Sequence, residues 1–475
     1  MVSDSSKKMW HIAKRELYDN LNSLRFALAT VLLLGLMLTN AAVYLHEQPK
    51  RIQKYNASVN ESLTDLTTRA GDLYTLAQVG PGLLYKKPSA LRFCAEGGET
   101  FLPNVVGGAF LWSISGGLKG FWRLNYPSTT PNLTDIRPNV AKVDWAFIIG
   151  YVLSLIAILF TFDAVSGERE LGTLRLMLAN PIPRYTVLIG KFLGALISIS
   201  IPFALAVLMN LLVISTSGAV QLGADAWGRL GIIFCIAVLY TGLFLALGLL
   251  VSARVSRSAV SLVILLLIWV TFVVFVPSTL ASIAGGFSSP MSTDELWQRR
   301  GELYAKRWER YDAYFAERVE RAKEIQFKGE HVIAEAEEQE RVNEEHLVQQ
   351  IDQVKFARQT TQVSPIAISQ HLIESFAGTG FERHLQFLEN ARTHARQFRK
   401  FIANTDSGDP ESSHIIGIRE GMSERPVNPA AVPKFEDTLN LSRDFDAAMM
   451  DLLLLVLLFV VLLSGAYLAF VRVEV

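Results

Sequence analysis

The sequence predicts an α-helical integral membrane protein with six transmembrane helices and two large polar insertions. Half of the 475 residues are hydrophobic, and many of them are gathered in six long runs that almost lack charge. At about 1.5 Å per residue, each run is long enough to cross a hydrocarbon layer of roughly 30 Å. The chain has 45 basic and 45 acidic residues and no formal net charge, so nucleic acid is not an expected partner.

The chain begins with a predicted interfacial helix. Residues 1–25 are rich in lysine and arginine, and their apolar residues recur at near-helical spacing. A basic amphipathic segment of this kind lies at the membrane interface before the chain enters the bilayer. Its apolar positions are Trp10, Ile12, Leu17, Leu21 and Leu24.

The six uncharged runs are the predicted transmembrane helices. The first is longer than the apolar core of a usual signal peptide and lacks a small-x-small cleavage site, so we interpret it as a retained span. The third contains Pro202 and the fifth contains Pro277, which membrane helices tolerate. The predicted spans are residues 26–45, 145–162, 192–216, 230–253, 258–284 and 452–471.

Two polar insertions, residues 46–144 and 285–446, separate these spans. Within the second insertion, residues 293–360 lack proline and carry an apolar stripe at spacings of three and four, which is typical of a long helix. Gly329 near its middle predicts a break, and hence a long helical hairpin or a coiled-coil-like domain. Residues 382–402 are predicted to form a further helix. The stripe consists of Tyr304, Trp308, Tyr311, Phe315, Val319 and Ala322.

The positions of the cations predict the orientation of the chain. Residues 1–25, 163–191 and 254–257 and the tail from Arg472 carry lysine or arginine close to a span, whereas the connection 217–229 has a single arginine. The positive-inside rule then places both termini in the cytoplasm and both insertions outside. We therefore expect a multi-pass protein of the inner (cytoplasmic) membrane.

Residues 163–191, between the second and third spans, form a segment that we call the charged island. Gly167 and Gly172 interrupt it, residues 173–178 form a predicted short amphipathic helix, and two following prolines end that helix. One interpretation is a solvated loop whose cations only set the topology. The other is that a partner protein grips the short helix.

The charged island resembles the first cytoplasmic loop of ABC-2 type (type V exporter-like) ABC transporter permeases. In that family the loop carries an acidic-basic cluster, Gly-Thr, a short helix, Pro and Arg, and then Gly-Lys at the next span. The basic N-terminus is similar to the elbow helix of the family, and six spans also match. The corresponding residues here are Gly167-Glu168-Arg169-Glu170, Gly172-Thr173-Leu174, Pro181 with Arg184, and Gly190-Lys191.

Most members of the family have small outer loops, and the two large insertions are a departure from that pattern. They resemble a bacterial subgroup that has a long segment after the first span and a helical one before the last. Ser364-Pro365, residues 377–380 and Phe387 are similar to recurring residues of the second insertion in that subgroup.

The resemblance implies a permease subunit that couples ATP hydrolysis in a separate cytoplasmic ABC ATPase to export, or to mechanical work on extracytoplasmic proteins. Residues 173–178 would be its coupling helix, and ATP and magnesium would be bound by the ATPase. A second copy of the chain, or a related permease, would complete the pathway. The residues that the resemblance assigns to ATPase coupling are Glu168, Arg169, Glu170, Gly172, Thr173, Leu174, Arg175, Pro181 and Arg184.

The sequence contains no constellation of catalytic residues, so we expect neither enzyme activity nor a cofactor in this chain. The phosphate-loop pattern G-x-x-x-x-G-K-[ST] does not occur. Five histidines lie in the helical part of the second insertion, and we expect exposed histidines on charged helices there; a metal site formed by His371, Glu374 and His384 is the less favoured alternative. Cys94 and Cys235 lie in different kinds of sequence and are not expected to pair.

A second class of function is a membrane scaffold or sensor that transports nothing and whose outer helical insertion binds a protein or ligand. The charged island separates the two classes. A receptor does not need Gly-Thr and Pro-Arg placed between its second and third spans, so the pattern favours the permease.

Overall fold

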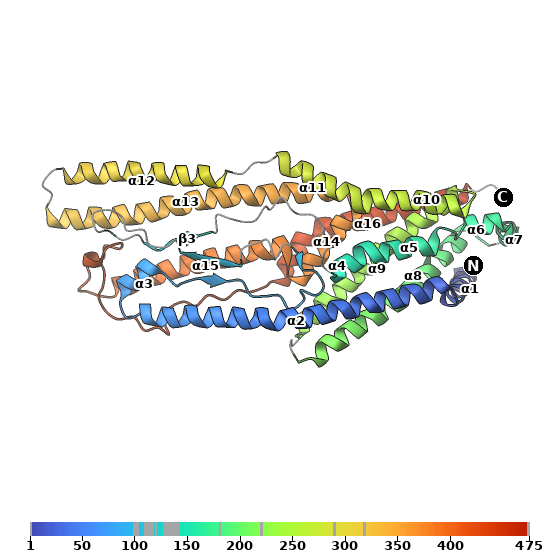
Figure 1. The fold of residues 1–475 in the computed structure, drawn as a ribbon, viewed down its shortest axis with the longest axis horizontal. Helices are drawn as coiled ribbons and strands as arrows, with labels where there is room; N and C mark the ends of the chain where they lie inside the picture. Colours follow the sequence, from blue (N-terminus) through green and yellow to red (C-terminus); the bar gives the residue numbers. More distant parts are fainter. Residues whose placement is uncertain are drawn as a thin grey trace.

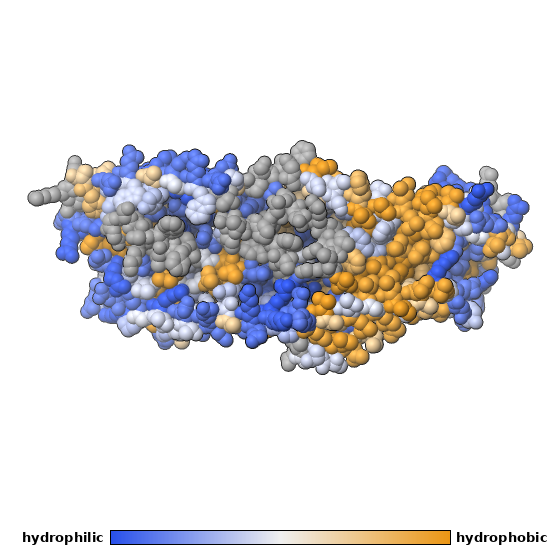
Figure 2. All heavy atoms as spheres, viewed as in Figure 1, coloured by the Kyte–Doolittle hydropathy of each residue, from blue (hydrophilic) through white to orange (hydrophobic). Residues whose placement is uncertain are grey.

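The computed structural model describes residues 2–97, 104–108, 118, 121–126, 143–179, 182–218, 222–287, 291–316 and 320–472. The molecule is elongated, with most membrane-spanning helices at one end and the helices of the two insertions at the other (Figure 1). A broad band of apolar side chains covers the visible face of the first end, and polar side chains gather at its outermost tip (Figure 2). Both termini lie near this tip (Figure 1).

Six helical segments are long and apolar enough to cross a membrane, as the sequence predicts. The first and last belong to longer helices that continue into the insertions. The six are α2 (Leu24–Arg69), α4-η3-α5 with α6 (Trp145–Glu170), α8 (Arg184–Thr216), α9 (Ala224–Arg254), α10-η4-α11 up to Ile283 (Ser258–Ile283) and α16 (Leu441–Val471).

Two of these spans contain a wider π-helical stretch. In the second span, η3 (Ile148–Leu153) lies between α4 (Trp145–Phe147) and α5 (Ser154–Thr161). In the fifth, η4 (Val270–Phe275) lies between α10 (Ser258–Trp269) and α11 (Val276–Phe287). The indole of Trp269 donates a hydrogen bond to Ser154 Oγ, 2.9 Å away, and so joins the two spans beside these stretches.

The first span does not end where its apolar run ends. Helix α2 continues through Pro49 to Arg69, so that the first part of the insertion is a direct extension of the span. It is followed by α3 (Leu73–Val79) and by a small antiparallel sheet in the order β1-β2-β3. The strands are β1 (Leu84–Tyr85), β2 (Val105–Gly108) and β3 (Leu124–Asn125).

The second insertion contains the predicted hairpin, but its break is not at Gly329. Helices α12 (Thr293–Phe315) and α13 (Arg321–Thr361) are separate helices that lie side by side (Figure 1). Gly329 lies inside α13, where a Cβ atom would meet Ile415 Cγ2 at 2.5 Å. Gly329 therefore leaves room for the loop that contains Ile415, which packs against α13 at this point, and does not interrupt the helix. The predicted stripe holds the hairpin together, since the rings of Tyr311 and Phe315 on α12 both contact the ring of Phe327 on α13; Val319 lies outside the described residues.

The remaining helices of this insertion connect the hairpin to the spans. Helix α14 (Pro365–Ala377) is almost wholly buried and packs against α9 and α16. Helix α15 (Gly380–Ser407) covers the predicted helix 382–402 and extends five residues beyond it. After the short η5 (Arg419–Gly421), the chain returns to the membrane as α16.

Candidate functional site

The charged island forms two short helices beyond the apolar band, close to both termini (Figure 1). These are α6 (Ser166–Glu170) and α7 (Thr173–Ala179). Gly172 joins them with a φ of +74°, a left-handed conformation that glycine adopts without strain. Thr173 Oγ1 donates a hydrogen bond to the carbonyl oxygen of Glu168 at 3.2 Å and closes the turn.

Helix α7 is amphipathic, as the sequence predicts. Leu174 is 2% exposed and anchors the helix, whereas Leu171 and Leu176 are 80% and 73% exposed. Arg169 and Arg175 are also exposed. We call Arg169, Leu171, Arg175 and Leu176 together the α6–α7 surface. Its two solvent-facing leucines are unusual for a loop outside the apolar band and are suited to an apolar partner.

The inner side of α6 is held by a group of three charges centred on a buried lysine. Lys191 of α8 is 4% exposed and pairs with Glu168 at 2.8 Å and with Glu16 of α1 (Val2–Leu21). A buried ammonium flanked by two carboxylates retains its partners because leaving it alone in a low-dielectric site is costly. Lys191 therefore connects three helices.

The N-terminus of α6 is capped by another span. Ser252 Oγ of α9 accepts hydrogen bonds from the backbone N–H groups of Val165 and Ser166, both at 3.0 Å. These amides are among those that an α-helix leaves unpaired at its start. Ser252 thus ties the charged island to the fourth span.

The other end of α6 contacts the fifth span. Glu170 accepts a hydrogen bond from the backbone N–H of Ser258 at 3.2 Å and another from the Ser258 hydroxyl. Ser258 is the first residue of α10, so the carboxylate lies at a helix N-terminus, where a negative charge is favourable. Any displacement of α6 therefore acts on α8, α9 and α10 through side-chain contacts.

Two arginines fix the borders of the island. Arg25, at the start of α2, pairs with Asp163 at 2.8 Å and lies over the Phe162 ring. Arg184, at the start of α8, donates hydrogen bonds to the carbonyl oxygens of Phe470 and Val471 at the end of α16. The island is thereby connected to the first and last spans as well.

The predicted coupling residues thus divide into two groups. Arg169, Gly172, Thr173 and Arg175 are exposed. Glu168, Glu170, Leu174 and Arg184 are engaged within the chain, and Pro181 lies outside the described residues. Leu171 and Leu176 were not predicted as surface residues, although apolar positions on the outer face of a short amphipathic helix could have indicated them. Ser252 and Ser258 were not predicted either, because a single hydroxyl at the end of a span has no recognisable pattern.

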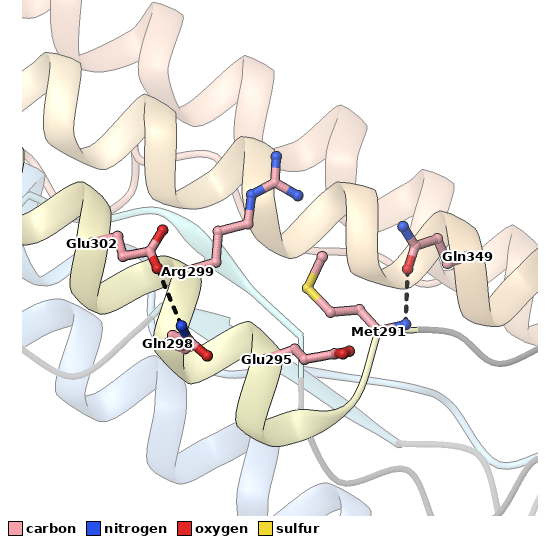
Figure 3. A pocket seen from close by; sticks show the side chains of 6 residues that line it. All are labelled: Met291, Glu295, Gln298, Arg299, Glu302 and Gln349. Atoms are coloured by element: carbon pink, nitrogen blue, oxygen red, sulfur yellow. Dashed lines mark hydrogen bonds between the residues drawn. The ribbon is translucent and has the colours of Figure 1, made fainter.

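A hollow of about 420 Å³ lies between α12 and α13 (Figure 3). Its polar groups mostly satisfy one another: Gln298 donates a hydrogen bond to Glu302 at 3.3 Å, Gln349 accepts one from the Met291 N–H at 3.0 Å, and Arg299 pairs with Glu345. The described lining therefore offers few unpaired groups for a ligand.

The five histidines in the helical part of the second insertion are buried, so the expectation that they are exposed was wrong; His414, in the loop that follows, is exposed. They lie on the inward faces of α13, α14 and α15, where burial disfavours the charged imidazolium. Burial, together with the charges of Lys86 and Arg383, lowers the pKa of His384 to about 3, and burial lowers that of His394 to about 4. Among the described residues, no three metal-ligating side chains converge. The buried histidines are His331, His346, His371, His384 and His394.

Six apolar helices, with a short amphipathic element held between them at one end, define a multi-pass membrane protein of the permease type. The family model described as "ABC-2 family transporter protein" matches residues 10–475, and the chain belongs to this family. The resemblance inferred from the charged island is thereby confirmed.

Two curated relatives are similar to part of the chain. One is the "Probable ABC transporter permease protein NosY" of Stutzerimonas stutzeri, 29% identical over 177 residues, which are 36% of this chain and 58% of that protein. The other is the protein of the same description from Pseudomonas aeruginosa, 33% identical over 184 residues, 38% of this chain and 60% of that protein. The chain thus spans less than two thirds of either relative.

Proposed function

We propose that this chain couples ATP hydrolysis, carried out by a separate cytoplasmic ABC ATPase that binds the α6–α7 surface, to movement of its membrane spans. The single observation that carries this proposal is the exposure of Leu171 and Leu176 on an element whose other side is fastened to the spans. An ATPase cleft that buries both leucines gains roughly 1.5–3 kcal/mol from each side chain. Arg169 and Arg175 beside them favour an acidic rim on that cleft.

The proposed force path follows the contacts of α6. A push or pull on α7 reaches α6 through the Gly172 turn. It then reaches α8 through Glu168–Lys191, α9 through the Ser252 cap and α10 through Glu170–Ser258. These contacts are polar and directional, so a displacement of α6 moves the ends of α8, α9 and α10 with it.

The rest of the assembly follows from the family and from the arrangement of charges. Both termini and the charged island would face the cytoplasm at the inner membrane, and the two insertions would lie outside. ATP and magnesium would be bound by the ATPase, since this sequence lacks a phosphate loop. A second copy of the chain or a related permease would complete the transporter. Its work would be either export of a substrate or mechanical action on an extracytoplasmic protein.

The test is copurification of an ATPase with the intact chain and with the double variant Leu171→Asp/Leu176→Asp. We expect the intact chain to recover ATPase activity and the variant to recover at least about tenfold less, because two buried leucines would be replaced by desolvated charges. Val348→Asp, at a 42% exposed position of α13, is the matched control and should recover as much as the intact chain. Equal recovery by all three proteins would contradict docking at this surface. No ATPase with the intact chain would favour a scaffold or sensor.

A further inference from the structure

The outward face of α1 combines cations with aromatic side chains. Lys7, Trp10, Lys14 and Tyr18 fall at spacings of three and four and therefore share one side of the helix, with Arg15 next to them. Trp10 is 55% exposed and Tyr18 is 68% exposed. We call these five residues the α1 stripe. Arg15 makes only a long, exposed contact with Asp19, at 3.9 Å.

The opposite face of α1 is fixed against α8. Gly190 and Gly194 allow α1 to pack closely on α8, because a Cβ atom on either glycine would meet α1 atoms at 2.8 and 2.6 Å. Ala13 is 1% exposed, and Asn20 donates a hydrogen bond to Ser198 at 3.2 Å. The helix therefore cannot rotate the α1 stripe inward without losing this packing, so the stripe stays presented to the surroundings.

The order of side chains along this face matches the order of layers at a bilayer surface. Cations come first, aromatic rings overlap them, and exposed aliphatic side chains follow at Leu21, Leu24, Leu28 and Val31, where α2 enters the apolar band. Lysine and arginine favour the headgroup layer, tryptophan and tyrosine the interface, and leucine the acyl chains. Charge complementarity then selects lipids with a net negative headgroup over zwitterionic ones.

We propose that the α1 stripe is a binding surface for anionic phospholipid headgroups. Phosphate oxygens of the lipid accept hydrogen bonds from Lys7, Lys14 and Arg15, and the rings of Trp10 and Tyr18 lie between headgroup and acyl chain. Since the inner face of the same helix supplies Glu16 to Lys191, bound lipid stabilises the position of the group that holds α6. Anionic lipid is thereby a structural ligand of the charged island.

The binding surface can be tested on the permease alone, so the result does not depend on the ATPase proposal. Cys235→Ser removes the exposed native thiol, Cys94 is buried, and His11→Cys places a fluorophore beside the stripe. The protein is reconstituted in vesicles of phosphatidylcholine with one quarter phosphatidylglycerol. Quenching is compared between nitroxide-labelled phosphatidylglycerol and nitroxide-labelled phosphatidylcholine at equal content.

We expect the anionic quencher to be at least about threefold more effective, since each cation near an anionic surface favours it about fivefold at full engagement. The ratio should fall with added salt, which screens exposed charges. Lys7→Gln/Lys14→Gln/Arg15→Gln should bring the ratio close to one. The matched control Lys306→Gln/Arg310→Gln/Lys323→Gln, on α12 and α13, should leave the ratio unchanged.

A ratio near one in the intact protein would overturn the proposal. Protection from both quenchers would also overturn it, because it would mean that protein covers the α1 stripe. The salt titration uses the intact chain and stays decisive if the triple variant misfolds.

Discussion

At the scale of single residues, Lys191 determines how the charged island is attached to the membrane helices. Its ammonium is almost completely buried between Glu16 and Glu168, so three elements share one ionic contact. Buried ionic groups add little net stability compared with well-packed apolar groups, but removing one partner leaves the others unpaired. Lys191 is thus expected to matter more for the arrangement of α1, α6 and α8 than for their total stability.

Lys191→Met should lower the free energy of unfolding by roughly 1–3 kcal/mol, because two partly buried carboxylates then face each other without a cation. The triple variant Lys191→Met/Glu16→Gln/Glu168→Gln should recover most of that loss, since no buried charge remains. Thermal unfolding in detergent measures both. Lys323→Met, at an exposed position, is the control and should change stability by less than about 0.5 kcal/mol. A single variant as stable as the intact chain would show that the three charges are not coupled.

The sequence predicts the parts of this site that depend on neighbouring residues, but not the contacts between residues far apart in the chain. The α7 helix and the break at Gly172 follow from local spacing and were predicted, whereas Leu174 was assigned to the partner ATPase and is buried within the chain. The pairing of Lys191 with Glu168 and Glu16 joins residues 23 and 175 positions apart. Local periodicity carries no information on such contacts, so the carboxylate of Glu168 was assigned to a partner protein although it faces inward.

At the scale of elements, amino-acid composition does not predict which helix faces of the second insertion are buried. Charged residues are frequent on α13 and α15, and the histidines there were expected to be exposed, yet α15 contributes Phe387, Leu388 and Phe398 to a buried core. A glycine in a helix-rich segment suggested a break, but at Gly329 it serves close packing against Ile415. Which face of a helix is covered depends on neighbours that are distant in the chain.

The buried histidines of α15 predict that acid destabilises the second insertion. Burial lowers the pKa values of His384 and His394 to about 3 and about 4 in the folded protein. In the unfolded chain the pKa of both histidines is near 6.5, so as the pH falls the unfolded chain binds protons before the folded protein does. Their contribution to stability is complete above about pH 6.5 and is lost between there and their folded pKa values, by roughly 2 kcal/mol each at pH 5. Melting temperatures at pH 8 and pH 5 measure the loss.

His384→Gln/His394→Gln should make that difference in melting temperature clearly smaller, whatever its effect on stability at pH 8. His11→Gln, on the exposed face of α1, is the control and should keep the original difference. If the double variant shows the same pH dependence as the intact chain, other groups cause the acid sensitivity.

At the scale of the whole molecule, one buried ion pair joins the spans to the second insertion. Arg229 of α9 pairs with Asp444 of α16 at 2.7 Å, and both are nearly inaccessible. Asp444 also accepts a hydrogen bond from Gln386 of α15, and Arg229 donates one to the Phe376 carbonyl of α14. Two spans and two helices of the insertion therefore meet at a single point, at the opposite end of the spans from α6 and α7 (Figure 1).

This arrangement makes movements of the spans and the insertion interdependent, and Arg229→Met tests it. The substitution leaves Asp444 buried without its cation and should cost roughly 3–5 kcal/mol, whereas Arg229→Met/Asp444→Leu should recover most of the loss. Hydrogen exchange should rise in α14 and α15 of the single variant before it rises in α9, because the insertion is released first. Arg396→Met is the control, since Arg396 pairs with Glu389 on the surface of α15 and should contribute less than about 1 kcal/mol. Equal exchange in all four proteins would show that other contacts, such as the packing of α14, hold the insertion to the spans, and the ion pair would then have no part in transmitting movement of α6 to the insertion.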